Sequence, residues 1–287
     1  MSLPKRTPEE WVTVFRVNGG VKTIFAEGQS DSRILKSVIS FRSDVDCRSA
    51  DEIDAETPSD DFIGGNKARV MQIAEEIDRL DEQTRTHIAS KVRCLIDRDF
   101  NDFIAEEFRL LGSNVLLITT FSNFLSAIVG YSFLRAVLFS SYGWDLDCKS
   151  WITLRDGLAF GFFARLRNAN STEKKSAPMI GKYFKLIGGN FRFDHAAYLQ
   201  AYFGLQGNAN TLIYVELASS SASVGDIKSA VNSADLFDAV YGMLKESGKA
   251  ASALNVHHLR STLLGGAVQA VRLDPTINEL ATWATSD

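Results

Sequence analysis

The sequence predicts an α/β fold, a mostly parallel sheet flanked by helices, with a mainly helical C-terminal region. Three observations lead to this prediction. Short β-rich runs alternate with helical stretches up to residue 119, which is typical of parallel sheets. Two of these runs stop abruptly at acidic residues. After residue 145 long apolar helical stretches dominate, so we expect two regions, residues 1–145 and residues 146–287.

The first strand is expected at 21–26, after a polar N-terminal segment that ends in an Asn-Gly-Gly turn at 18–20. A helical stripe follows from residue 32 to residue 41, with Asp31 as its N-cap. Residues 44–61 then carry eight acids against one base, which predicts a long exposed loop. This acidic loop is either a docking surface for a basic partner or a solvated insertion.

A Gly-Gly-Asn-Lys turn at 64–67 opens a helix over 68–80, and polar residues 81–91 precede a strand at 92–96. A helix to about residue 111 and a strand at 115–119 complete a β-α-β-α-β order. Further helices are expected at 151–167, 235–244 and 275–283. The turn does not have the GxxxxGK[ST] spacing of a P-loop, so it does not support nucleotide hydrolysis of that kind.

Composition indicates a globular cytoplasmic protein. Hydrophobic residues make up 45% of the chain, and the net charge is −4. The three cysteines show no disulfide or zinc spacing, and the N-terminus has no apolar signal segment. Residues 110–134 contain no charged side chain, but their Gly-Ser-Asn break and scattered polar residues favour a buried strand and helix over a membrane span.

The candidate active site is a set of acids at two strand ends. Asp97 and Asp99 would share one face, and Glu27 and Asp31 follow the first strand. Crowded carboxylates repel one another unless a cation neutralises them, and Mg²⁺ or Mn²⁺ would join such oxygen ligands to a substrate phosphate. We expect Asp97 and Asp99 to bind the metal, with Glu27 as a further metal ligand or as the general acid/base. Asp31 would bind a second metal or support a ligand from behind, and Lys67 would counter the charge of the phosphate. Any one of these acids alone is better explained as an exposed acid at a strand end, or as a helix cap in the case of Asp31, but the ordered set favours a metal site.

A basic stretch at 165–192 is the candidate nucleic-acid surface. It has seven bases against one acid, and its aromatic residues Tyr183, Phe184 and Phe191 could stack on unpaired bases. The alternative is a solvated face of two helices with core aromatics. The seven bases are Arg165, Arg167, Lys174, Lys175, Lys182, Lys185 and Arg192.

These motifs resemble a known family. Glu27-Gly28 with Asp31, followed later by Asp97-x-Asp99, resembles the Toprim domain of topoisomerases, primases and OLD-type nucleases, and Gly64-Gly65-Asn66-Lys67 is similar to the Gly-Gly-Lys element of OLD-like members. The resemblance covers roughly residues 20–140. The chain length and the helical tail without an attached ATPase look most like the DUF4435 group.

The resemblance implies a Mg²⁺- or Mn²⁺-dependent endonuclease that serves as the toxic effector of an anti-phage abortive-infection system of the PARIS kind. An ABC-type, AriA-like ATPase partner would hold it inactive. After release it would form a homodimer and cut host nucleic acid, with RNA and in particular tRNA as the candidate substrate. No membrane role is implied.

One position departs from the family pattern. DUF4435 proteins tend to have a threonine and an Ile-Glu-Asn-like element after the next strand. Thr119 matches the threonine, but Ser122 stands here where the glutamate is expected. Asp102 could substitute for that acid. The alternative function is therefore a non-catalytic Toprim-like interaction module bound to an ATPase. A topoisomerase- or primase-type enzyme is disfavoured because the chain is short and has no zinc module.

Overall fold

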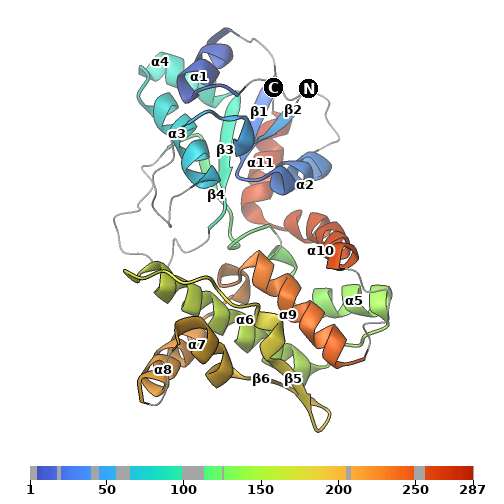
Figure 1. Cartoon of the computed structure of the whole chain (residues 1–287). Coiled ribbons are helices and arrows are strands. Elements are labelled where there is room, and N and C mark those ends of the chain that lie inside the picture. The colour runs from blue at the N-terminus through green and yellow to red at the C-terminus, as the bar shows by residue number, and fades with distance from the viewer. Residues whose placement is uncertain are drawn as a thin grey trace. The chain divides into compact units, whose positions relative to one another are not determined.

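The chain folds into two compact units (Figure 1). The structure, a computed structural model, describes residues 5–17, 21–39, 45–55, 65–98, 113–124, 126–204, 208–248 and 256–286. Unit 1 comprises Met1–Thr120 together with Val268–Asp287, and unit 2 comprises Phe121–Ala267. The predicted α/β class is confirmed. The units divide at residue 120 instead of 145, and the C-terminal segment belongs to unit 1 because its helix packs there.

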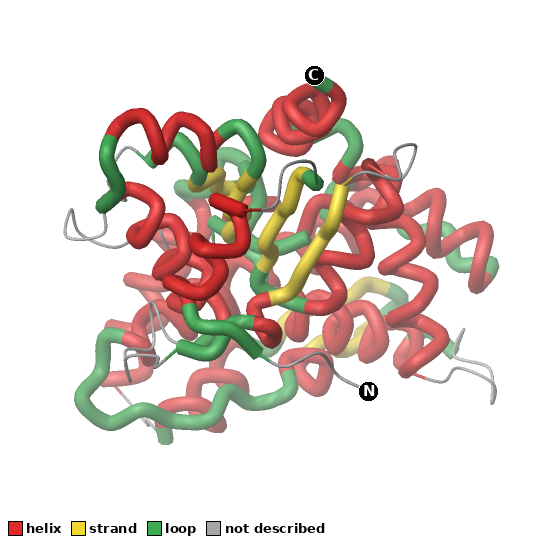
Figure 2. The backbone as a smooth tube through the Cα atoms, turned by 90° about the horizontal axis from the view of Figure 1, so that it is seen from above, coloured by secondary structure: helices red, strands yellow, loops and turns green. Residues whose placement is uncertain are grey.

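Unit 1 contains a four-stranded sheet with the order β2-β1-β3-β4, and every neighbouring pair is parallel. Figure 2 shows strands of this sheet side by side among helices. Ala26 pairs with Leu95, so the carboxyl ends of β1 and β3 lie together at one edge. The strands are β1 (Lys22–Ala26), β2 (Val45–Ser49), β3 (Val92–Ile96) and β4 (Leu116–Ile118).

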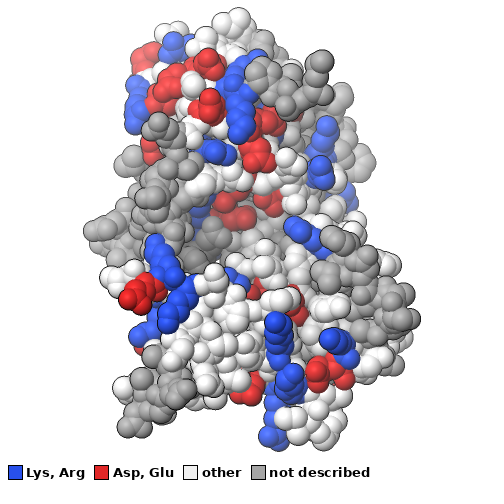
Figure 3. Space-filling view, viewed as in Figure 1, with Lys and Arg blue, Asp and Glu red and all other residues white. Residues whose placement is uncertain are grey.

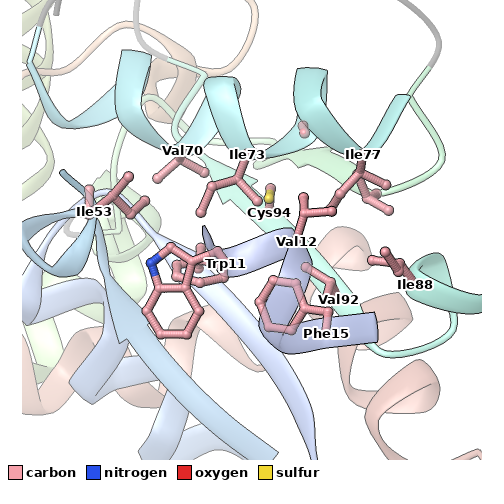
Figure 4. Close-up of a cluster of buried hydrophobic side chains, with 14 of the residues drawn as sticks. Trp11, Val12, Phe15, Ile53, Val70, Ile73, Ile77, Ile88, Val92 and Cys94 are labelled. Atoms are coloured by element: carbon pink, nitrogen blue, oxygen red, sulfur yellow. The ribbon is translucent and has the colours of Figure 1, made fainter. Parts of the chain in front are cut away.

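Helices cover the sheet and bury its apolar side chains. Helices α1 (Pro8–Val17), α3 (Asn66–Asp78) and α4 (Glu82–Ala89) enclose a core that includes side chains of β1 and β3 (Figure 4). In that core the rings of Trp11 and Phe25 pack edge to face, with their centroids 5.2 Å apart. Helix α2 (Gln29–Ile39) packs on β1 and β2 and also contacts α11 (Pro275–Thr285).

Three expectations for unit 1 were wrong. The predicted polar N-terminal segment contains α1, and the predicted polar residues 81–91 contain α4. The predicted acidic loop 44–61 contains β2 and the short 3-10 helix η1 (Ala50–Glu52). Within this segment the Arg48 guanidinium forms ion pairs with the carboxylates of Asp46 and Glu52, with N–O distances of 2.5 Å in both. Three of the charged side chains are therefore paired with one another along an edge strand.

Unit 2 is mainly helical and is built around α6 (Cys148–Ala169). Residues 157–164 of α6 are all buried, because α8, α9 and β6 pack around this helix. The remaining elements are α5 (Tyr131–Tyr142), β5 (Phe184–Ile187), β6 (Asn190–Phe193), α7 (His195–Phe203), α8 (Asn208–Ala222), α9 (Ser233–Glu246), α10 (Val256–Val271, whose last turn counts with unit 1) and the 3-10 turns η4 (Ser126–Ile128), η5 (Ile180–Tyr183) and η6 (Ile227–Ser229).

The uncharged stretch 110–134 forms several short elements. Its described part contains β4, η4 and the start of α5. Across the portions of the chain that the structure describes, none of the helices combines the length and the apolar character that a membrane crossing requires.

Candidate active site

The site begins where β1 and β3 end. Glu27 follows β1 directly, and Asp97 follows β3 directly. Because the two strands are parallel neighbours, both residues reach the same edge of the sheet. The Glu27 carboxylate accepts a hydrogen bond from the backbone N–H of Asp97, with 2.7 Å between Oε1 and N. The structure therefore brings these two predicted acids together, although 70 positions separate them in the chain.

Lys67 reaches the same place from the start of α3. Gly65 precedes the helix with a φ of 67°, a conformation that glycine adopts readily and other residues rarely do. This turn directs the Lys67 side chain inward, where only 5% of the residue is exposed. Its ammonium group donates a hydrogen bond to the carbonyl oxygen of Asp97, with Nζ and O 2.8 Å apart. Glu27 and Lys67 thus fix the backbone N–H and the backbone carbonyl of Asp97, respectively.

Asp31 lies on the turn that follows Glu27. It is the third residue of α2, not the predicted N-cap, because the helix begins at Gln29. A Cβ placed on Gly28 would lie only 2.7 Å from Oδ2 of Asp31. The carboxylate therefore folds back over Gly28, and an alanine at that position would displace it.

The metal set is only partly described. Asp99, Asp102 and Gly64 lie outside the described residues. Within the ranges that are described, no three His, Cys, Asp or Glu side chains form a group suited to a metal ion. Glu27 and Asp97 supply carboxylate oxygens, which are the donors that Mg²⁺ prefers. Asp97 is largely buried, with 8% of its surface exposed.

Thr119 is a further residue near the site, and sequence reasoning assigned it no role beyond matching the threonine of the family pattern. It follows β4, and its hydroxyl oxygen accepts a hydrogen bond from the backbone N–H of Arg98 at 3.2 Å. Arg98 connects Asp97 to Asp99, so Thr119 helps to fix the backbone between two predicted metal ligands. The feature that points to Thr119 is its position directly after β4, the strand that pairs with β3.

Ser122, where a glutamate was expected, is part of unit 2. Only 1% of the residue is exposed. Its hydroxyl donates a hydrogen bond to the carbonyl oxygen of Val231 and lies 3.2 Å from Ser126 Oγ. The serine therefore joins two buried segments of unit 2.

The predicted basic stretch does not form one surface. Arg165 makes a bidentate pair with Asp235, whose side chain is 4% exposed, and the Nε to Oδ2 distance is 2.7 Å. Burial lowers the pKa of Arg165, but the hydrogen bonds and charge of Asp235 outweigh it, so the pKa is raised overall. Arg167 pairs with Glu216. Arg165 is therefore a half-buried cation that is already paired within unit 2, and its predicted role in nucleic-acid binding stays a prediction.

The other predicted bases are distributed differently. Lys175 donates to the carbonyl oxygen of Phe203 at 2.7 Å, and Lys174 lies beside it in an exposed segment. Phe184 and Phe191 are buried, so the prediction that they stack on bases was wrong. The bases Lys182, Lys185 and Arg192 are exposed on or next to the β5–β6 hairpin.

Comparison with known proteins does not identify a family: no family model matches the chain, and a search of curated proteins finds no match.

Proposed function

We propose that this chain is a metal-dependent nuclease of the Toprim type that hydrolyses phosphodiester bonds. The observation that carries the proposal is the double anchoring of Asp97. Its N–H is held by the Glu27 carboxylate and its carbonyl oxygen by the Lys67 ammonium. Acids from two strand ends and a buried cation thus share one sheet edge, where α/β proteins commonly carry their chemistry.

The donor set fits a hard divalent cation. Glu27 and Asp97, together with Asp99, would hold Mg²⁺ or Mn²⁺ through carboxylate oxygens. When bound, such an ion stabilises charge on a scissile phosphate and activates water. Lys67 orients the turn that carries Asp97 and lowers the repulsion between the acids. Asp31 lies in the first turn of α2, shortly after Glu27 in the chain, where its carboxylate would take a proton from the attacking water.

The biological setting follows from the resemblance of the motifs. The family resemblance extends to AriB, the Toprim effector of the PARIS phage-defence system. On this basis the protein acts in the cytoplasm as an abortive-infection effector. An ABC-type ATPase of the AriA kind restrains it, and the released form dimerises and cuts host RNA, with tRNA as the first candidate.

A non-catalytic interaction module is the second candidate. The specific observation in its favour is Ser122, which replaces an expected glutamate and whose hydroxyl is used in packing against Val231. In that case the anchored Asp97 would be a structural feature of a domain that binds the ATPase without cutting nucleic acid.

The test is Glu27→Gln, which keeps an oxygen that can accept from the Asp97 N–H but removes the negative charge. We expect the fold to survive and cleavage of tRNA with Mg²⁺ or Mn²⁺ to fall about a hundredfold or more, because a metal ligand is weakened. The matched control is Glu82→Gln in the first turn of α4, which removes an exposed acid.

Cleavage of tRNA, single-stranded DNA and double-stranded DNA is measured with wild type and both variants, with EDTA as the metal-free arm. Full activity of Glu27→Gln would mean that the site is elsewhere. If the wild type cuts none of these substrates and harms no cells when its partner is triggered, the interaction-module alternative holds.

A further inference from the structure

The β5–β6 hairpin forms a separate two-stranded sheet in unit 2. Its strands are antiparallel, and a two-residue turn of Gly188 and Gly189 joins them. Both glycines have positive φ angles, 58° and 79°, as tight hairpin turns of the I′ type require. The turn fixes the register, in which Lys185 lies directly opposite Arg192 and Ile187 opposite Asn190.

One face of the hairpin is anchored in the core. Phe184 and Phe193 lie opposite each other, are both buried, and have ring centroids 4.9 Å apart. They press against α6 at Gly157, where a Cβ would lie 2.5 Å from Cζ of Phe184. The carbonyl oxygen of Phe191 accepts a hydrogen bond from Thr153 Oγ1 at 3.2 Å. This packing holds the strands in a defined orientation.

The other face is exposed and basic. Because side chains alternate along a strand, Lys185, Ile187, Asn190 and Arg192 share this face, and all four are exposed. Lys and Arg side chains gather over this end of unit 2 (Figure 3). Among the described residues, Glu246 forms an ion pair with this face, with its Oε1 3.7 Å from Nζ of Lys185. The side chains of this pair are 50% and 36% exposed, so solvent screens the pair at this distance and it neutralises little.

The cross-strand pair itself points to an anionic ligand. Like charges directly opposite each other on a sheet face destabilise it. A phosphate between Lys185 and Arg192 would turn that repulsion into two attractive contacts. Ile187 and Asn190, nearer the turn, would offer an apolar surface and an amide to a base.

We propose that the β5–β6 hairpin of unit 2 is an RNA-binding element that contacts unpaired segments, with Lys185 and Arg192 on adjacent phosphates and Ile187 and Asn190 on a base. This inference rests on the proposed nuclease function, which supplies the RNA substrate. An anionic lipid surface would also attract the two cations. RNA is favoured because Leu186 and Ile187 point to opposite faces, so the tip has no continuous apolar surface to insert into a membrane.

The test compares two double variants that remove equal charge. Lys185→Ala/Arg192→Ala alters the hairpin, and Lys149→Ala/Arg155→Ala alters exposed bases of α6. Both are made in the Glu27→Gln background so that the probe is not cut. Binding of fluorescein-labelled oligouridine and of unfractionated tRNA is followed by anisotropy across a range of salt concentrations.

We expect the hairpin variant to bind about tenfold more weakly. In a plot of log K against log salt concentration, the slope of the hairpin variant should be less negative than that of its parent by about 1.4. This difference corresponds to roughly 0.7 for each of two lost phosphate contacts. The α6 variant should bind like its parent. Thermal unfolding should show the hairpin variant no less stable than its parent, since the like-charge pair is gone.

Equal affinity of the hairpin variant and its parent would overturn the inference, as would an equal loss in the α6 variant. Loss of binding to phosphatidylserine vesicles with unchanged RNA binding would assign the hairpin to lipid instead. These outcomes are separate from the nuclease test. RNA binding that depends on the hairpin, together with undiminished cutting by Glu27→Gln, would overturn the catalytic site alone.

Discussion

At the scale of single residues, the site depends on how closely Asp31 approaches Gly28. The backbone of Gly28 does not have a positive φ, so other residues could adopt its conformation. The conflict that an alanine would create is therefore with the end of the Asp31 side chain, 2.7 Å from the new Cβ. A flexible carboxylate can move away at small energetic cost, but it then leaves its position over Gly28, the residue that follows Glu27.

Gly28→Ala should therefore separate stability from activity. We expect the free energy of unfolding to change by less than about 1 kcal/mol. Cleavage should fall about tenfold or more because a misplaced group loses its alignment. In an Asp31→Asn background the same substitution should have little further effect, since both changes act on one carboxylate. If the losses of cleavage from Gly28→Ala and Asp31→Asn simply add in the double variant, displacement of the Asp31 carboxylate is not the cause of the Gly28→Ala effect.

The sequence predicted the acidic residues at the strand ends but not the hydrogen bonds of the residues around them. Glu27 and Asp97 were predictable because each directly follows an apolar β-rich run. The role of Thr119 was not predictable, because its hydrogen bond to Arg98 depends on which strand neighbours β3. Ser122 contacts Val231 across 109 positions, and no local pattern records such a pairing.

At the scale of elements, buried apolar patterns were predictable and polar edges were not. The predicted strand 92–96 agrees with β3, because its side chains are almost all buried. Strand β2 reads Val-Asp-Cys-Arg-Ser and is half-exposed at the sheet edge, so its composition suggests a loop. The β5–β6 hairpin was also missed, although a Gly-Gly pair between alternating residues is a hairpin signal.

Glycine positions test how closely elements of unit 2 pack. A Cβ on Gly242 of α9 would lie 2.3 Å from the carbonyl oxygen of Gly181 in η5, and backbone atoms cannot yield as side chains do. We expect Gly242→Ala to destabilise unit 2 by about 1–3 kcal/mol, despite the better helix propensity of alanine.

Gly265 of α10 is the matched control, because nothing lies within 4 Å of its hypothetical Cβ. Gly265→Ala should leave packing unchanged and stabilise the protein by about 0.5–1 kcal/mol. Urea denaturation of both variants measures the difference. A stabilising effect at Gly242 would mean that α9 and η5 do not pack as closely as described.

At the scale of the whole molecule, the chain leaves unit 1 at residue 120 and returns to it at residue 268. Composition gives no sign of this return, since α11 resembles any other amphipathic helix of the C-terminal region. Its place is set by tertiary contacts. Lys22 donates to the carbonyl oxygen of Trp283 at 2.7 Å, and Thr276 Oγ1 donates to the carbonyl oxygen of Ile118 at 3.1 Å. The second contact ties α11 to the end of β4.

Two leucines near the C-terminus measure how much unit 1 depends on α11. Leu280 is fully buried, and Leu273, just before the helix, is 80% exposed. Leu280→Ala should cost about 2–5 kcal/mol through lost burial and a new cavity. Leu273→Ala should change stability by less than about 0.5 kcal/mol. Hydrogen exchange followed by mass spectrometry should show Leu280→Ala lowering protection in β1, β3 and β4 while α6 keeps its protection. Equal effects of the two substitutions, or a loss confined to unit 2, would mean that α11 does not stabilise the sheet that carries the site.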